Sequence, residues 1–163
     1  FGNRIARSFA SRYPARVRSL VLLAAGDSGP PTDVRNDIFR ILLSFLPDST
    51  RSGALHRAFF APDNRAPDYW MTGWYPRAGL AQGRATARTP LAQWSGGGTA
   101  PMLVVQPAQD AAAPDGAEKL KQLYPDRVTI VSLANAGHAI LPEQPEEIAR
   151  IVLGHLDSQR SER

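Results

Sequence analysis

The hydrophobic pattern alternates between residues at helical spacing and short, continuous apolar runs. Apolar residues recur every three or four positions through Gly2–Tyr13 and predict a helix that ends before Pro14. The apolar run Arg18–Ala25 is typical of a strand buried on both faces of a parallel sheet. Further strands are predicted at Met102–Val105 and at Val128–Leu133, each bounded by turn residues.

Helices are predicted after the second and third of these strands. Asp115 and Glu118 resemble a capping box at the start of a helix that Pro125 ends. Pro145 fits the first turn of a last helix, in which four apolar residues share one face: Ile148, Ile151, Val152 and Leu156. This order of strands and helices predicts an α/β fold with a parallel sheet of about three strands.

Residues 31–98 show no strand pattern and predict a helical insertion, or cap, within a core formed by residues 1–30 and 99–157. Thr32 is a plausible N-cap for its first helix, and a weaker helix is predicted over Ala78–Ala87. The run Ser95–Gly98 is expected to be a flexible joint, and the tail, residues 158–163, is expected to fray. Four aromatic residues either line an apolar substrate pocket or pack the cap onto the core: Phe59, Phe60, Trp70 and Trp74.

Two residues with catalytic chemistry follow neighbouring predicted strands. Asp110 comes after the second strand and His138 after the third, with Gly137 allowing a sharp turn before the histidine. Ligands bind at the carboxyl edge of a parallel sheet, so both side chains are expected at that edge. There the aspartate can accept the Nδ1 proton of the imidazole, which leaves the other ring nitrogen as a general base. The alternatives are that Asp110 only caps the following turn and that His138 only bonds a carbonyl.

Composition narrows the function further. The 163 residues are 43% hydrophobic, which suits one domain with a core. No cysteine is present, which excludes disulfides, thiolate zinc sites and cysteine nucleophiles, and neither a metal nor a cofactor is predicted. The net charge of +4 comes from scattered arginines, so a nucleic-acid partner is not expected. The apolar runs are too short to span a bilayer.

The motifs together resemble the α/β-hydrolase superfamily. Phe1-Gly2-Asn3-Arg4-Ile5-Ala6 is similar to the residues just after that family's nucleophile, and V-V-Q-P-A-Q-D-A-A-A-P resembles the motif of its catalytic acid, here Asp110. A-G-H-A-I-L-P-E-Q-P-E-E-I resembles the motif of its catalytic histidine, here His138. Pro107 departs from this pattern, because the family commonly has glycine there. The resemblance covers almost the whole chain but only the C-terminal half of the family.

The resemblance implies a triad whose nucleophile would be the residue before Phe1, with the Phe1 backbone N–H as one donor of the oxyanion hole. The parent protein would hydrolyse small apolar esters or related acyl compounds, and the chain alone would be inactive. An aspartate nucleophile would instead indicate an epoxide hydrolase or dehalogenase. A serine parent could also cleave carbon–carbon bonds or perform cofactor-free peroxidation, and a member without a nucleophile could bind ligands only.

The chain begins at Phe1 and not at methionine, and we expect its first partner to be the N-terminal half of the same protein. The sheet edge and the helix Gly2–Tyr13 should then each expose an apolar surface. Such surfaces promote association, so the chain expressed alone is expected to aggregate.

Overall fold

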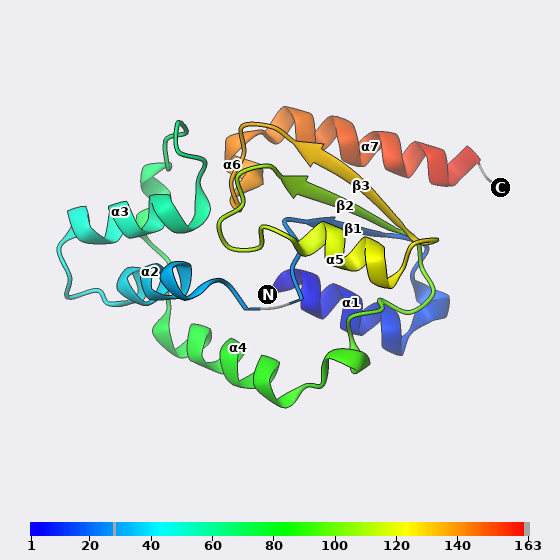
Figure 1. The fold of residues 1–163 in the computed structure, drawn as a ribbon, viewed down its shortest axis with the longest axis horizontal. Coiled ribbons are helices and arrows are strands. Elements are labelled where there is room, and N and C mark those ends of the chain that lie inside the picture. Colours follow the sequence, from blue (N-terminus) through cyan, green and yellow to red (C-terminus); the bar gives the residue numbers. More distant parts are fainter. Residues whose placement is uncertain (28, 162–163) are drawn as a thin grey trace.

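The computed structural model describes residues 1–27 and 29–161 and contains one parallel β-sheet. Its strands are β1 (Leu20–Leu23), β2 (Met102–Pro107) and β3 (Val128–Leu133), in the spatial order β1-β2-β3. The first residues of the three strands are aligned in the pairing register, and all three strands run in one direction (Figure 1). The predicted α/β fold with a parallel sheet is confirmed.

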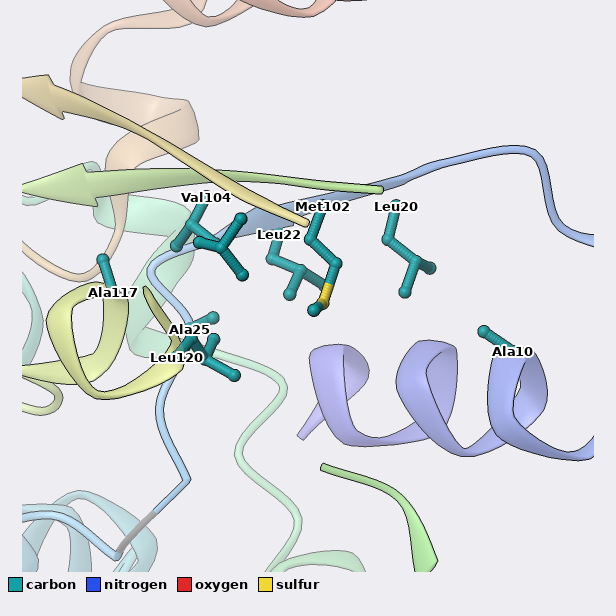
Figure 2. Close-up of a cluster of buried hydrophobic side chains, with 9 residues drawn as sticks. Ala10, Leu20, Leu22, Ala25, Met102, Val104, Ala117 and Leu120 are labelled. Atoms are coloured by element: carbon teal, nitrogen blue, oxygen red, sulfur yellow. The ribbon is translucent and has the colours of Figure 1, made fainter. Parts of the chain in front are cut away.

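Helices cover both faces of this sheet. The helices α1 (Gly2–Arg12) and α5 (Gly116–Leu123) lie on one face, and α7 (Pro145–Ser161) lies on the other (Figure 1). A cluster of buried apolar side chains fills the space between α1, α5 and the sheet, as Figure 2 shows: Ala10, Leu20, Leu22, Ala25, Met102, Val104, Ala117, Leu120 and Val128. Burying each larger side chain of this kind contributes about 1.5–3 kcal/mol.

The central strand β2 contributes to the cores on both faces. Its alternate residues Leu103 and Val105 point away from the first cluster and pack with Ile148 and Ile151 of α7. Burial on both faces explains why β2 reads as a continuous apolar run. Leu156, predicted on the same face of α7, is 46% exposed and lies beyond this core.

The first strand is shorter than predicted and is fully buried on one face only. Leu20 and Leu22 are buried, whereas Val21 and Leu23 are half-buried. Ala24 takes a left-handed φ of +49°, which ends the extended backbone after Leu23. Since β1 lies at one end of the strand order, β2 is its only neighbour among the described strands.

One face of α1 carries apolar side chains that remain accessible. Ile5 and Phe9 of α1, and Tyr13 directly after its end, lie four residues apart and are 57%, 47% and 44% exposed. Side chains at this spacing lie along one side of a helix. The uncovered apolar surface expected on this helix is therefore present in the structure.

Between β1 and β2 the chain forms the helical segment, residues 32–93. It contains α2 (Thr32–Leu42), α3 (Asp48–Phe59) and α4 (Pro76–Arg88), with 3-10 helices at Asp68–Met71 and Leu91–Gln93. No strand occurs in this segment, all of which is described, in agreement with the sequence pattern. Its core joins α2 and α3 to the loop after β3: Val34, Ile41, Ala54, Leu55, Ala58, Phe60 and Ala139.

The buried carboxylate of Asp37 links α2 to α3. It accepts two hydrogen bonds from the Arg57 guanidinium at 2.8 and 2.9 Å and one from Arg40 at 2.7 Å. The hydrogen bonds from Arg57, and to a smaller extent the one from Arg40, lower the pKa of the Asp37 carboxyl below its ordinary value. The ionised carboxylate therefore stabilises the contact between these helices.

The run Ser95–Gly98 is not the flexible joint predicted from its glycines. Gly98 donates its N–H to the Ser11 hydroxyl at 3.1 Å, and Arg127 donates to two carbonyl oxygens of the run at 2.8 and 2.9 Å. Gly98 has a φ of +64°, and a Cβ there would lie 2.4 Å from the Ala10 carbonyl oxygen. The glycines thus permit close packing of the turn against α1.

Both predicted helix caps are absent. Asp115 precedes α5, but its ψ of 17° lies outside the extended region typical of a capping residue, and its carboxylate lies 3.7 Å from Lys119 Nζ. Gln106 of β2 caps the helix instead, because its Oε1 accepts the Ala117 N–H at 3.1 Å. Thr32 is the first residue of α2 and not its N-cap.

The C-terminal helix is longer than predicted. A short helix, α6 (Ile140–Glu143), precedes α7, and α7 continues to Ser161. Residues 158–161 are thus part of α7, residues 162 and 163 lie outside the described residues, and the fraying of the tail stays a prediction. Within residues 1–27 and 29–161, no helix is long and apolar enough to cross a membrane.

Candidate active site

Asp110 and His138 lie just beyond the carboxyl ends of β2 and β3. Two backbone hydrogen bonds join the loops that carry them. The Ala108 N–H donates to the Leu133 carbonyl at 2.9 Å, and the Gln109 N–H donates to the Ala136 carbonyl at 3.0 Å. Pro107 is the buried last residue of β2, so the chain forms this turn without the glycine common in the family. The two loops meet at the sheet edge where the sequence placed both residues.

The two side chains are in direct contact. His138 Nδ1 lies 3.0 Å from each carboxylate oxygen of Asp110. Because a carboxylate accepts hydrogen bonds, Nδ1 is the donor, and in the neutral imidazole Nε2 then keeps its lone pair. Asp110 Oδ1 also accepts the backbone N–H groups of Ala112 and Ala113 at 2.9 and 2.8 Å. The carboxylate therefore caps the following turn as well as contacting the imidazole, so both interpretations of Asp110 describe real contacts.

A second carboxylate, which the sequence analysis missed, fixes the loop that carries His138. Glu143 Oε2 accepts the Gly137 N–H at 2.7 Å. Its other oxygen accepts the Ala61 N–H at 2.8 Å and the Asn64 side-chain amide at 2.7 Å. Glu143 thus ties the residue before His138 to the chain just after α3. The sequence signal was the glutamate in the histidine motif, but nothing in the sequence shows its distant partners.

The backbone around His138 is packed directly against the end of α3. Ala139 donates its N–H to the Phe59 carbonyl at 2.8 Å. A Cβ on Gly137 would lie 2.6 Å from the Ala61 nitrogen, so only glycine fits this approach. Glycine at this position therefore serves a close backbone contact between the histidine loop and the helical segment.

His138 borders an open cavity of about 900 Å³ between the sheet edge and the helical segment. The Phe59 ring lies 5.8 Å from the imidazole and lines this cavity, as does Trp74. Phe60 and Trp70, also predicted to line a pocket, do not border it. They pack against each other with ring centroids 5.1 Å apart, and Phe60 is buried. The aromatic residues thus divide between the two roles that the sequence left open.

Phe1 lies on the wall of the same cavity as His138, at the start of α1. Its carbonyl oxygen accepts the Arg4 N–H at 3.0 Å as the helix begins. The backbone N–H groups at the start of a helix point away from the helix body and attract negative charge. The oxyanion role suggested for Phe1 is compatible with this position and stays a prediction.

Comparison with known proteins identifies the family to which the chain is similar. Residues 2–151 match the family model described as the alpha/beta hydrolase family. A bacterial membrane phospholipase A superposes with a TM-score of 0.69 and 24% identity, over 97% of this chain and 55% of its own. A thermophilic esterase from Thermogutta terrifontis superposes with a TM-score of 0.67 and 21% identity, over 97% of this chain and 62% of its own. The 2-hydroxy-6-oxo-6-phenylhexa-2,4-dienoate hydrolase of Rhodococcus sp. strain RHA1 superposes with a TM-score of 0.67 and 18% identity, over 96% of this chain and 61% of its own.

No curated protein sequence matches the chain. The superpositions show a shared fold, and this chain spans 55–62% of the length of the three structures compared. The family match extends from the start of α1 into α7 and includes Asp110 and His138. The chain belongs to the alpha/beta hydrolase family.

Proposed function

We propose that this chain supplies the base and the acid of a nucleophile–histidine–aspartate triad in a longer protein that hydrolyses small apolar esters. The observation that supports this most strongly is the contact of His138 with Asp110 at the wall of an apolar cavity. The nucleophile is the residue that precedes Phe1 in the longer protein.

In the first half-reaction the nucleophile, taken as serine, attacks the acyl carbon of the ester. His138 Nε2 removes the hydroxyl proton, and the Asp110 carboxylate stabilises the imidazolium that forms. The carbonyl oxygen becomes an oxyanion, which the Phe1 N–H and a donor outside this chain would stabilise. His138 then returns its proton to the leaving alkoxide, and an acyl–enzyme remains.

In the second half-reaction water replaces the alcohol. His138 Nε2 removes a proton from this water, which attacks the acyl carbon, and the carboxylic acid leaves as serine is reprotonated. The wall formed by Phe59 and Trp74 would hold the apolar part of the acyl group beside the imidazole.

The test uses the complete polypeptide encoded by the gene and 4-nitrophenyl butyrate as substrate. We expect serine before Phe1 and measurable release of 4-nitrophenol. His138→Gln should lower kcat by about 10²–10⁴-fold, the usual contribution of a general base. His155→Gln, a change in α7 away from the cavity, is the matched control and should leave kcat within about twofold.

Two results would contradict the proposal. An aspartate before Phe1, with turnover of epoxides or haloalkanes, would replace the acyl mechanism by an alkyl–enzyme mechanism. A residue with no nucleophilic group, together with no turnover, would make the protein a binding member of the family. Turnover of a carbon–carbon substrate in place of simple esters would keep the triad and change the substrate class.

A further inference from the structure

The cavity at His138 has an apolar wall that also carries positive charge. Most of its lining is apolar, but Arg4, Arg35 and Arg84 border it as well. Among the described residues, no aspartate or glutamate does. The three arginines come from α1, α2 and α4, so three separate helices direct cationic residues toward one space.

Eight arginines lie in the helical segment, and pairing alone does not decide which of them border the cavity, because Arg77 and Arg88 form no ion pair among the described residues and do not border it. Four of them form ion pairs with aspartates: Arg40 and Arg57 with Asp37, Arg51 with Asp48, and Arg65 with Asp68. None of these four borders the cavity. Arg35 and Arg84 do border it, and in the described part of the chain neither forms an ion pair. Within the described residues, the guanidinium of Arg35 donates a single hydrogen bond, at 3.4 Å to the neutral Thr32 hydroxyl.

Arg4 extends the positive wall toward the catalytic side of the cavity. It lies one helical turn beyond Phe1, and its guanidinium carbon is 5.3 Å from the centre of the Trp94 ring. Stacking on an aromatic face stabilises a guanidinium without cancelling its charge. Arg4 also interacts with the Asp27 carboxylate through space, so we assign the main anion contacts to Arg35 and Arg84.

We propose that the cavity binds compounds with an apolar body and one anionic group, such as a carboxylate or sulfonate, placed away from the reacting carbonyl. Arg35 and Arg84 hold the anion, while Phe59 and Trp74 contact the apolar body. As a statement about substrate, this rests on the proposed ester hydrolysis. As a statement about binding, it needs no catalysis and can be tested without it.

The expected effect is moderate because Arg35 and Arg84 are both exposed residues. An exposed ion pair changes a binding constant by up to about fivefold. Since each pair contributes about 1.4- to 5-fold, replacing both arginines should weaken binding of an anion by about 2- to 25-fold. Binding of a neutral molecule of the same shape should be unchanged.

The binding test uses two fluorescent probes and the complete polypeptide. 8-Anilinonaphthalene-1-sulfonate carries one sulfonate, and N-phenyl-1-naphthylamine is the same body without it. We expect the double variant R35Q/R84Q to raise the Kd of the sulfonate about 2- to 25-fold and to leave the Kd of the neutral probe within about 1.5-fold. The control R77Q/R88Q removes the same charge from the ends of α4, where neither arginine borders the cavity, and should change neither Kd.

Equal weakening of sulfonate binding by both double variants would show a general charge effect and would overturn the inference. An unchanged sulfonate Kd in R35Q/R84Q would overturn it as well.

A kinetic comparison separates the inference from the proposed function. If mono(4-nitrophenyl) adipate and 4-nitrophenyl valerate both fail to react while the binding result holds, ester hydrolysis is wrong and the anion site stands. If both react and R35Q/R84Q leaves their kcat/KM ratio and the sulfonate Kd unchanged, hydrolysis stands and the anion site is wrong.

Discussion

Replacing Glu143 with alanine should both destabilise the protein and disturb His138. The change removes the acceptor for the buried N–H groups of Ala61 and Gly137, at 2.8 and 2.7 Å, and for the Asn64 side chain. A buried donor without a partner costs about 1–3 kcal/mol, so the two backbone groups together cost about 2–6 kcal/mol. Glu143 is only half-buried, and water entering its place favours the lower half of this range.

The measurement is urea unfolding of the complete protein, with the free energy of unfolding compared between variants. Glu143→Gln keeps one acceptor oxygen and should lie between the wild type and Glu143→Ala. Glu146→Ala is the matched control, because Glu146 is exposed in the first turn of α7. It should cost less than about 1 kcal/mol, the size of a helix-dipole contribution.

A second readout separates positioning from stability. If Glu143 holds the loop before His138, the ¹⁵N resonance of His138 Nδ1 should shift in Glu143→Ala at temperatures where the variant is folded, and kcat should fall. Neither should change in Glu146→Ala. Equal unfolding free energies for the two alanine variants, with an unchanged His138 resonance, would refute the role assigned to Glu143.

Three further outcomes are expected. Gly137→Ala should lower the unfolding free energy by about 1–3 kcal/mol or more in thermal melts, because its Cβ would lie 2.6 Å from the Ala61 nitrogen. Asp110→Asn should lower kcat of the complete enzyme by about 10³–10⁴-fold with little change in KM, since His138 loses the acceptor that fixes its tautomer. The pKa of Asp37 is lowered in the folded protein, so its contribution to stability is fully present above the ordinary aspartate pKa of about 3.9. That contribution is lost as pH falls through the folded pKa. Asp37→Asn should therefore flatten the acid limb of the stability–pH curve below about pH 4.

The sheet and the His138–Asp110 contact could be predicted because both depend on local pattern and on parallel topology. The structure places β3 at Val128–Leu133, the range that its β-branched residues predicted. Two residues that follow adjacent parallel strands reach the same edge whatever connects them. The positions of Asp110 and His138 after adjacent strands were therefore enough to predict that their side chains lie close together.

The contacts of Glu143 could not be predicted, because its acceptor role depends on residues about 80 positions earlier in the chain. In the sequence it is one of three glutamates in P-E-Q-P-E-E-I. Likewise Trp70 and Trp74 lie only four positions apart, and which of them borders the cavity depends on how the 3-10 helix Asp68–Met71 packs. The spacing of these residues in the sequence does not predict which side chain faces the cavity.

The cap of α5 shows a different limit. Asp115 has the residue type and the spacing for a capping box, yet Gln106 from β2 supplies the acceptor. A partner from a neighbouring strand replaced a local one, which propensity cannot anticipate. The error changed no prediction about the site, because α5 begins after Asp110 in either case.

The buried turn Ser95–Gly98 limits how helical segments could be exchanged between relatives to make chimeric enzymes. A junction inside the run would bring in donor residues, and any residue other than glycine at position 98 would place its Cβ 2.4 Å from the Ala10 oxygen. A changed backbone path there would also displace the Gly96 and Gly98 carbonyls that Arg127 binds. A crossover at Thr89–Pro90, where both residues are exposed after α4, leaves the turn with the sheet. Donor segments should therefore be grafted up to Thr89 only, so that the recipient keeps its own residues from Pro90 onward.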